Sequence, residues 1–407
     1  MVFNSIPTDE KYYRFWDPLF PDTNPSLFLN KYLYRVMTNT SVPFFNYPAL
    51  FSAQEAEITP ILLDVLRRGA YIMQKDLRQF EENLANFLGA KYAIGVADGT
   101  IALVMALRGA GIQPGDEVIV PSHTFVASAA AIHHAGATPV LVECAADHLI
   151  DPDSVVNAIT SKTKAIMPVQ LNGRTANMDV LQAIADEHNL LIIEDSAQAL
   201  GSKYKGKYAS TFGIAGTFSF YPAKLLGCYG DGGAVITNDD QLASKVYSMR
   251  DHGRGESGDV VLWGYNARLD NLQAAVLDFK LKTFPETIER RRQIATRYNN
   301  ALGSIADLIL PPAPDASPDH FDVYQNYEIE SGHRNQLREY LKDNGVGTII
   351  QWGGKAIHQF KDLGFNVDLP YTTRLFSRCL MLPMHHILSD DDVDYVCETI
   401  HRFYSTI

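Results

Sequence analysis

Short apolar runs alternate with amphipathic segments along most of the chain. The segments with helix-like spacing of apolar residues or helix-favouring composition begin at Glu55 and include residues 77–87, 101–107, 152–159, 178–188 and 241–250. The short runs that favour strands are residues 94–97, 117–120, 139–142, 165–169, 190–195, 216–221 and 234–237. Strands that alternate with helices are typical of a mostly parallel sheet with helices on both faces. The pattern therefore predicts an α/β fold.

The pattern also divides the chain into three parts. A proline cluster at residues 311–314 marks a boundary, and after it strand-like segments at 324–329 and 346–350 alternate with helices at 335–344 and near the C-terminus. We therefore predict a large domain over residues 43–302 and a small α/β domain over residues 303–407. Residues 1–42 are rich in aromatic residues and prolines, too aromatic for a disordered tail. We expect this N-terminal extension to pack against the body or a neighbouring subunit.

The bulk composition is that of a globular protein. Of the 407 residues, 46% are hydrophobic and 20% are charged, and the formal net charge is −12. The sequence contains no basic run or basic face that would indicate binding to nucleic acid. An anionic substrate must therefore be bound by a local group of donors, because the overall field is negative.

Metal, membrane and export signals are absent from the sequence. The four cysteines are widely scattered and fit neither a metal site nor a disulfide framework. His358, His385 and His386 lack the spacing of metal ligands, so we expect no metal. The N-terminus is not a charged leader before an apolar core, and no apolar run is long enough to span a membrane. These features predict a cytoplasmic protein that does not bind membranes.

Lys224 is the residue around which the candidate chemistry is arranged. It follows the apolar run 216–221, which Pro222 interrupts, and a glycine-rich turn leads from it to the run 234–237. Partial desolvation in such a turn lowers the pKa of a lysine and makes its amine a nucleophile toward a carbonyl, which permits a Schiff base. The alternative is an ordinary solvated loop lysine.

Two further parts of the sequence contain residues that could take part in such chemistry. Asp195 ends the run 190–195, at the carboxyl end of a predicted parallel strand, where it could keep a cofactor pyridine nitrogen protonated or merely cap a turn. Gly99 and Thr100 follow another strand and open a helix. The free amides of a helix start bind phosphate, although a simple helix cap is the alternative.

Four motifs in this order resemble the signature of a known family. They are Asp195-Ser196-Ala197-Gln198, Ser219 to Lys224, Gly230 to Gly233, and Asn266 to Ala275. This set is similar to that of the DegT/DnrJ/EryC1/StrS family, which are pyridoxal phosphate aminotransferases of nucleotide-linked keto sugars. The resemblance extends from about residue 43 to the C-terminus. It implies the type I, aspartate aminotransferase-like fold, with a large mixed sheet domain and a small C-terminal domain.

The resemblance also implies a set of cofactor contacts. Lys224 would hold pyridoxal 5'-phosphate as a Schiff base and move protons, with Asp195 against the ring nitrogen. The other implied roles are phosphate binding by Gly99, Thr100 and Ser219, ring stacking by Phe125, contact with the phenolic oxygen by Gln198, and contact with the phosphate of a partner subunit by Asn266. A homodimer with shared active sites follows from the last of these.

Other positions are less fixed by the resemblance. Arg268 could grip a substrate carboxylate in a bidentate pair or form a surface ion pair. His123 we expect to be a structural loop residue. Gln74 and Lys75 replace a Gly-Pro pair of most relatives, and residues 351–354 stand where many have His-Tyr-Pro.

The implied reaction transfers an amino group from L-glutamate to a nucleotide-linked keto sugar in amino-sugar or surface-polysaccharide biosynthesis. The loop Leu226 to Asp231 is most similar to relatives that aminate a 3-keto sugar. One alternative is a sugar dehydratase, but relatives of that class resemble this family with histidine at the lysine position. Another is a cofactor-binding regulator fused to a DNA-binding module, which would need a basic helical module that the N-terminal region lacks.

Overall fold

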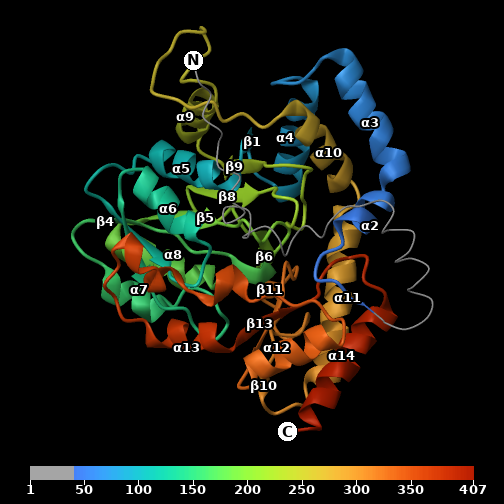
Figure 1. Cartoon of the computed structure of the whole chain (residues 1–407). Coiled ribbons are helices and arrows are strands. Elements are labelled where there is room, and N and C mark those ends of the chain that lie inside the picture. Colours follow the sequence, from blue (N-terminus) through green and yellow to red (C-terminus); the bar gives the residue numbers. More distant parts are fainter. Residues whose placement is uncertain (1–40) are drawn as a thin grey trace, which may run out of the picture.

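A seven-stranded sheet forms the centre of the molecule in the computed structural model, which describes residues 41–407 (Figure 1). The strand order is β1-β9-β8-β5-β4-β2-β3. β9 is antiparallel to both of its neighbours, and the other pairings are parallel. The strands are β1 (Tyr92–Val96), β2 (Glu117–Pro121), β3 (Thr138–Val142), β4 (Thr163–Ile166), β5 (Leu191–Asp195), β8 (Ala215–Ser219) and β9 (Gly233–Thr237). The predicted α/β class with a mixed, mostly parallel sheet is confirmed.

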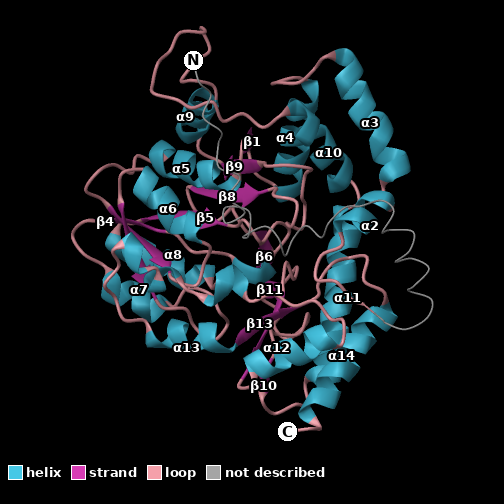
Figure 2. Cartoon of the chain, viewed as in Figure 1, coloured by secondary structure: helices cyan, strands magenta, loops and turns pink. Residues whose placement is uncertain are grey.

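Helices cover both faces of this sheet (Figure 2). Successive residues of β9 point to opposite faces, so Val235 joins one apolar cluster while Ala234 and Ile236 join the other. Such two-sided burial explains why the strands are nearly continuous apolar runs. The helices of this part are α2 (Tyr47–Ser52), α3 (Glu55–Arg68), α4 (Lys75–Leu88), α5 (Gly99–Gly109), α6 (Val126–His134), α7 (Pro152–Ala158), α8 (Met178–His188), α9 (Asp240–Arg250) and α10 (Asn271–Leu281).

A smaller antiparallel sheet lies beside the large one, with the order β10-β12-β13. Its apolar face packs against three helices around a separate core. Its strands are β10 (Leu308–Ile309), β12 (Tyr327–Ser331) and β13 (Cys379–Leu382), and its helices are α11 (Phe284–Leu302), α12 (Arg334–Asp343) and α14 (Asp390–Tyr404). The other described elements are α13 (Pro370–Arg378), a small sheet of β6 (Lys203–Tyr204), β7 (Lys207–Tyr208) and β11 (His320–Phe321), and the short 3-10 helices η2 (Leu171–Gly173), η3 (Gln351–Gly354), η4 (Ile357–Gln359) and η5 (Lys361–Leu363).

One predicted strand forms only in part. Residues 346–350 contribute two isolated bridges, Val346 with Val42 and Ile349 with Met381. Val42 accepts a hydrogen bond from Gly347 N–H (2.8 Å) and donates one to the Gly345 carbonyl (2.9 Å), so this segment pairs with the chain preceding the large sheet. The prediction of a regular strand was therefore wrong, because the segment pairs only at isolated positions and with two different segments of the chain.

The described part begins inside the predicted N-terminal extension. Val42 is fully buried in the core of the smaller sheet. Residues 1–40, on which most of the extension prediction rests, lie outside the described residues, and the domain limits at 43 and 303 stay predictions. Within residues 41–407, none of the helices has both the length and the apolar character needed to cross a membrane.

Candidate active site

The candidate site is built where strands β5 and β8 end. These parallel neighbours are in register, with Asp195 opposite Thr217. β5 ends at Asp195 and β8 at Ser219, and the chain then turns through Lys224 before it enters β9. Ligands of open α/β sheets bind at the carboxyl ends of their strands. The fold thus brings the two residues singled out for chemistry to one edge.

Asp195 is a buried carboxylate, 4% exposed, that is held by hydrogen bonds to both of its oxygens. The hydroxyl of Ser128 donates to Oδ2 at 2.6 Å and the Ala197 N–H donates to Oδ1 at 3.1 Å. Because the Ser128 proton points at Asp195, Thr124 must donate its own hydroxyl proton to Ser128 at 2.8 Å. This relay fixes the orientation of the carboxylate.

Lys224 is half-buried in the turn after β8. Its N–H donates to the Tyr221 carbonyl at 2.8 Å, which closes the turn. Burial lowers the pKa of Lys224 to about 8, and the attraction of Asp195 offsets only part of that effect. An ordinary lysine has a pKa near 10.4. Near pH 8 about half of the Lys224 side chains therefore carry a neutral, nucleophilic amine.

A glutamine just before β12 of the smaller sheet forms hydrogen bonds with the backbone of this turn. Gln325 is 5% exposed and lies just before β12. Its side-chain oxygen accepts from Leu225 N–H at 2.7 Å, and its amide nitrogen donates to the Ala223 carbonyl at 2.7 Å. Both neighbours of Lys224 are thus tied to one side chain. The sequence does not identify Gln325 as a site residue, because Gln325 and Leu225 are 100 residues apart and no local pattern indicates their contact.

The start of α5 forms a close-packed cradle beside β8. Asp98 caps this helix by accepting from Ile101 N–H at 2.8 Å. A side chain at Gly99 would place its Cβ 2.8 Å from the Cβ of Ser219, and one at Gly233 would place it 2.4 Å from the Asp98 carbonyl oxygen. Glycine at these positions therefore lets the helix start approach Ser219. The half-buried Thr100 follows in the first turn.

Phe125 and Gln198 flank the site from two other loops. The Phe125 side chain is 52% exposed, and its ring centroid lies 6.5 Å from that of Trp352. Gln198 accepts from Asn172 N–H at 2.9 Å and from the side-chain amide of Asn326 at 3.2 Å. Trp352 lies within residues 351–354, where the sequence departs from the family pattern. The structure places it beside the predicted stacking residue.

Asn266 and Arg268 lie together on a segment that pairs with residues 96 and 251. Arg268 donates to the carboxylate of Asp251 at 2.7 Å and to the side-chain oxygen of Asn266. Burial by itself would raise the pKa of Asp251, but the bonds to Arg268 and Arg254 outweigh it and lower the pKa. Of the two alternatives open for Arg268, the structure contains an ion pair. Its contact with a substrate carboxylate stays a prediction.

These residues fit the predicted cofactor by their chemistry. A partly neutral lysine amine can bond an aldehyde, a buried carboxylate with fixed orientation can hold a protonated ring nitrogen, and a helix start with serine and threonine hydroxyls can hold a phosphate. The space that a Cβ at Gly99 would fill is an independent sign that a close backbone approach is required. The arrangement can therefore hold pyridoxal phosphate.

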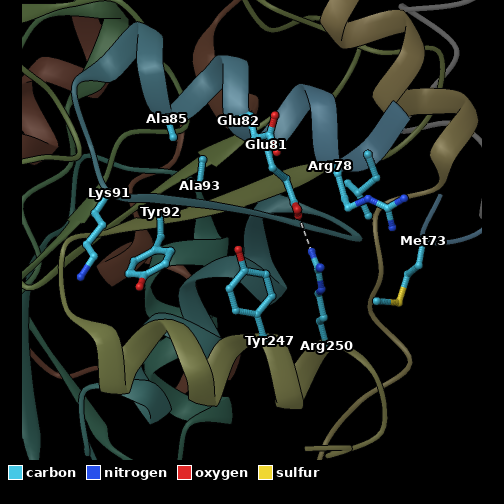
Figure 3. A pocket seen from close by; sticks show the side chains of 11 residues that line it. Met73, Arg78, Glu81, Glu82, Ala85, Lys91, Tyr92, Ala93, Tyr247 and Arg250 are labelled. Atoms are coloured by element: carbon cyan, nitrogen blue, oxygen red, sulfur yellow. Dashed lines mark hydrogen bonds and ion pairs between the residues drawn. The ribbon is translucent and has the colours of Figure 1, made fainter. Parts of the chain in front are cut away.

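A separate cavity of about 330 Å³ lies between α4, β1 and α9 and contains no predicted site residue (Figure 3). Arg250 and Glu81 form an ion pair that reaches across it. Arg250 also donates to the Gly95 carbonyl at 2.9 Å, and Gly95 N–H donates to Glu81 at 2.7 Å. The charges are satisfied by each other and by one glycine of β1, which indicates a structural role.

Comparison with known proteins identifies the class. The model of the DegT/DnrJ/EryC1/StrS aminotransferase family matches residues 52–401, and the chain belongs to this family. The solved structure of NtdA from Bacillus subtilis with the bound cofactor PMP has a TM-score of 0.83 and 30% identity, and the match covers 90% of this chain and 86% of that one. The type I fold and the dependence on pyridoxal phosphate are thereby confirmed, and the chain is an aminotransferase.

Two curated relatives are similar over most of their length. The dTDP-3-amino-3,4,6-trideoxy-alpha-D-glucose transaminase of Streptomyces venezuelae is 41% identical over 313 residues, which are 76% of this chain and 82% of the relative. The pleiotropic regulatory protein of Geobacillus stearothermophilus is 38% identical over 369 residues, 89% of this chain and 99% of the relative. Similarity alone therefore links the chain to relatives with enzymatic and with regulatory names.

Proposed function

We propose that this aminotransferase moves an amino group from L-glutamate to carbon 3 of a nucleotide-linked keto sugar, in amino-sugar or surface-polysaccharide biosynthesis. The observation that carries the proposal is the pairing of a half-buried Lys224, whose pKa is lowered to about 8, with the buried and doubly bonded Asp195 at the same sheet edge. The 3-amino product named for the Streptomyces relative supports the position on the sugar.

Lys224 carries the cofactor and then moves the proton. Pyridoxal phosphate supplies an aldehyde that bonds amines and a ring that withdraws electrons from the carbon next to the bound nitrogen. With the cofactor and the amino donor bound, the free Nζ of Lys224 would take a proton from the α-carbon of the donor. It would give a proton back to the carbon on the other side of the bound nitrogen. Its lowered pKa lets it do both near neutral pH.

The other predicted residues hold the cofactor in place. Asp195 would hold the protonated ring nitrogen, and the Ser128 and Ala197 donors fix the orientation of its carboxylate. The start of α5, Thr100 and Ser219 bind the phosphate. Phe125 packs on the ring, and Gln198 contacts the phenolic oxygen. Each of these roles is part of the proposal.

Asn266 is the residue that we assign to the partner's phosphate in a homodimer. It is exposed within one chain, as a residue that contacts a second subunit must be. Mixing inactive Lys224→Ala and Asn266→Ala proteins should restore activity, because one mixed site then has both residues. A mixture that stays as inactive as its components would contradict shared sites.

Arg268, two positions further, is the proposed substrate contact. To bind a substrate carboxylate, it would have to give up its ion pair with Asp251.

The test of function separates the enzymatic from the regulatory alternative. Purified protein is loaded with pyridoxal phosphate, and its visible absorbance is followed as L-glutamate is added without sugar. Conversion of the cofactor to its amine form, with release of 2-oxoglutarate, establishes the first half-reaction. dTDP- and UDP-linked 3-keto and 4-keto sugars are then offered to the amine form, and the aminated carbon is located by NMR.

Each outcome decides a separate part of the proposal. Amination at carbon 4 would overturn the position on the sugar, and an amino donor other than glutamate would overturn the donor. If the cofactor binds but no amine or sugar changes it, the regulatory alternative holds. Loss of a sugar hydroxyl without amination would instead indicate a dehydratase.

A further inference from the structure

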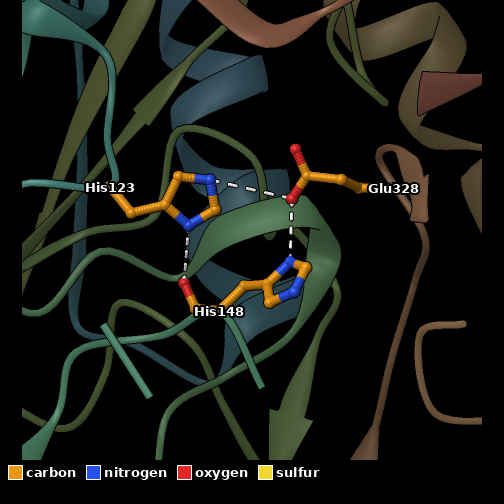
Figure 4. Close-up of side chains that lie close together, drawn as sticks. All are labelled: His123, His148 and Glu328. Carbon is orange, nitrogen blue, oxygen red and sulfur yellow. Dashed lines mark hydrogen bonds and ion pairs between the residues drawn. The ribbon is translucent and has the colours of Figure 1, made fainter. Parts of the chain in front are cut away.

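Three side chains from distant parts of the sequence meet below the site in a buried cluster (Figure 4). His123 follows β2, His148 lies between β3 and α7, and Glu328 is on β12 of the smaller sheet. His123 is 1% exposed and Glu328 is 2% exposed. One ligand atom of each residue lies within 4.8 Å of the other two. The proposed transamination uses none of them.

The hydrogen bonds fix the proton positions in this cluster. His123 Nδ1 lies 3.0 Å from the His148 carbonyl oxygen, which can only accept, so Nδ1 carries the proton. With the proton on Nδ1, the neutral ring carries a lone pair on Nε2. That lone pair faces Glu328 Oε2 at 3.7 Å. Two electron-rich atoms thus face each other inside the protein.

Among the described residues, neither His123 Nε2 nor Glu328 Oε1 has a hydrogen-bond partner. A buried polar atom without a partner costs about 1–3 kcal/mol. A cation bonded to His123 Nε2 and to the Glu328 carboxylate would remove the cost at Nε2, because it accepts electron pairs from both groups. The geometry calls for a positive ion that bonds nitrogen and oxygen.

His148 completes a ligand set. Its Nδ1 lies 2.9 Å from Glu328 Oε2, and its Nε2 lies 3.3 Å from Glu330 Oε1. A metal ion would bond His148 Nδ1, while Nε2 would keep its proton and donate it to Glu330.

We propose that His123 Nε2, His148 Nδ1 and a Glu328 carboxylate oxygen bind one Zn²⁺ ion, with water as the fourth ligand. Zinc bonds of about 2.0–2.2 Å in a tetrahedron separate the ligands by roughly 3.4 Å. The separations of 2.9 Å and 3.7 Å to Glu328 lie on either side of that value. Two histidines and one carboxylate are a ligand set that zinc accepts.

The surroundings have the supporting contacts that zinc histidines need. Ligand histidines almost always donate their second N–H to a carboxylate or a backbone carbonyl. His123 donates to the His148 carbonyl, and His148 donates to Glu330, which Arg378 in turn contacts at 3.2 Å. Both histidines are therefore oriented with one nitrogen left for the ion.

The ion would tie the two sheets together beneath the active site. It joins the loops after β2 and β3 to strand β12. Glu328 also accepts from the side chain of Asn172 at 3.0 Å, and Asn172 N–H donates to Gln198 at 2.9 Å. The zinc is thus a structural link that also positions Gln198. It takes no part in bond making.

The test uses the tag-free, full-length protein with its cofactor. Metal content is measured by mass spectrometry after exchange into metal-free buffer and again after one equivalent of Zn²⁺ is added. We expect one zinc per chain. Zinc X-ray absorption should show a first shell of nitrogen and oxygen with imidazole scattering. A protein that binds no zinc with saturation, or whose shell contains sulfur, overturns the proposal.

Variants locate the ion. His148→Asn, chosen because Asn tolerates the left-handed backbone at this position (φ 68°), and Glu328→Gln should lose the zinc. Glu330→Gln should weaken it by about 10–100-fold. The matched control replaces the exposed pair His133 and His134 by Asn and should keep it. Zinc retained in folded His148→Asn and Glu328→Gln proteins contradicts the site. Should these variants not fold, the absorption spectrum of the wild-type protein decides.

Discussion

Two combinations of a basic side chain and a carboxylate lie at different places around the large sheet, and they differ in how their charges are satisfied. Glu81 and Arg250 touch each other, and both bond the backbone of Gly95, so the pair is closed. Asp195 is bonded to Ser128 and Ala197, while it acts on Lys224 electrostatically. In the first pair both side chains bond each other and the backbone, whereas in the second the amine of Lys224 stays available for chemistry.

The comparison shows that burial of charge alone does not identify a catalytic site. Burial raises the pKa of Glu81, and Arg250 opposes that rise. Burial likewise lowers the pKa of Lys224, and Asp195 opposes that fall. The same two effects act in both places. The two places differ in what the side chains bond. Glu81 and Arg250 bond each other, whereas Lys224 keeps its amine for a ligand.

Replacement of Lys224 gives the largest expected effect. Lys224→Ala should lower the rate of the glutamate half-reaction on the order of 10⁴-fold, because it removes both the cofactor bond and the proton carrier. Single-turnover absorbance measurements check this.

Lys280 offers a matched control for that variant. Burial also lowers the pKa of Lys280 to about 8, but this lysine donates to the Gly227 carbonyl at 2.6 Å. Lys280→Met should keep the half-reaction. Loss of activity in Lys280→Met together with activity in Lys224→Ala would reverse our assignment.

Replacement of Glu81 in the Glu81–Arg250 pair should lower the stability of the protein and leave the rate of the reaction unchanged. Glu81→Gln leaves Arg250 buried without its counter-charge and should cost about 3–5 kcal/mol in the free energy of unfolding. Urea denaturation at a fixed cofactor concentration measures this cost. The rate constant of the folded variant at low temperature should match that of the wild-type protein. A large fall in rate without a change in stability would contradict the structural role of the pair.

Asp195→Asn tests the other half of the comparison. The neutral amide keeps the size of the side chain but no longer holds a proton on the cofactor ring, so the rate should fall about 10²-fold with little change in stability. Ser128→Ala, which removes only the 2.6 Å bond that aims Asp195, should have a smaller effect of about tenfold. Stopped-flow traces give both rates. Equal rates in Asp195→Asn and wild type would exclude the proposed role.

Gln325 should influence the rate without touching the cofactor. Gln325→Ala frees both neighbours of Lys224 and should lower the rate about tenfold through misplacement of the amine. A merely structural role would change the melting temperature but leave the pH profile in place. We expect the profile to move toward higher pH as the freed turn admits water.

The pH profile itself follows from the direction of the Lys224 shift. The charged form is disfavoured, so the amine is protonated and unreactive below about pH 8 and neutral above it. The rate of cofactor attachment to the apoprotein should rise from pH 6 to 8 and become constant about one pH unit higher. A rise that continues toward pH 10 would mean an ordinary solvated lysine.

The sequence predicted those parts of the fold and the site that depend on residues close together in the chain. Apolar runs located the parallel strands, and Asp195 was placed correctly at the end of its strand because strand ends are readable from the run itself. The four motifs located the family. Contacts between distant segments were not predictable. Gln325 reaches the Lys224 turn from the smaller sheet, and the cluster of His123, His148 and Glu328 draws on three elements.

The Trp352 segment is an intermediate case. Its departure from the family pattern was visible in the sequence, yet its contact with Phe125 depends on a left-handed backbone at Trp352 (φ 47°). Such a conformation is uncommon for a bulky residue, and although the two glycines that follow indicate a turn, they do not indicate that Trp352 itself adopts it. The sequence therefore indicated that something differs there and left its nature open.

The most direct test of the account is the identity of the lysine that bears the cofactor. Borohydride reduction of the loaded protein fixes the cofactor to its lysine, and peptide mass spectrometry then locates the modified residue. We predict that the modified peptide contains Lys224 and that Lys280 is unmodified. Modification of Lys280 or of any other lysine, with Lys224 free, would contradict the central claim.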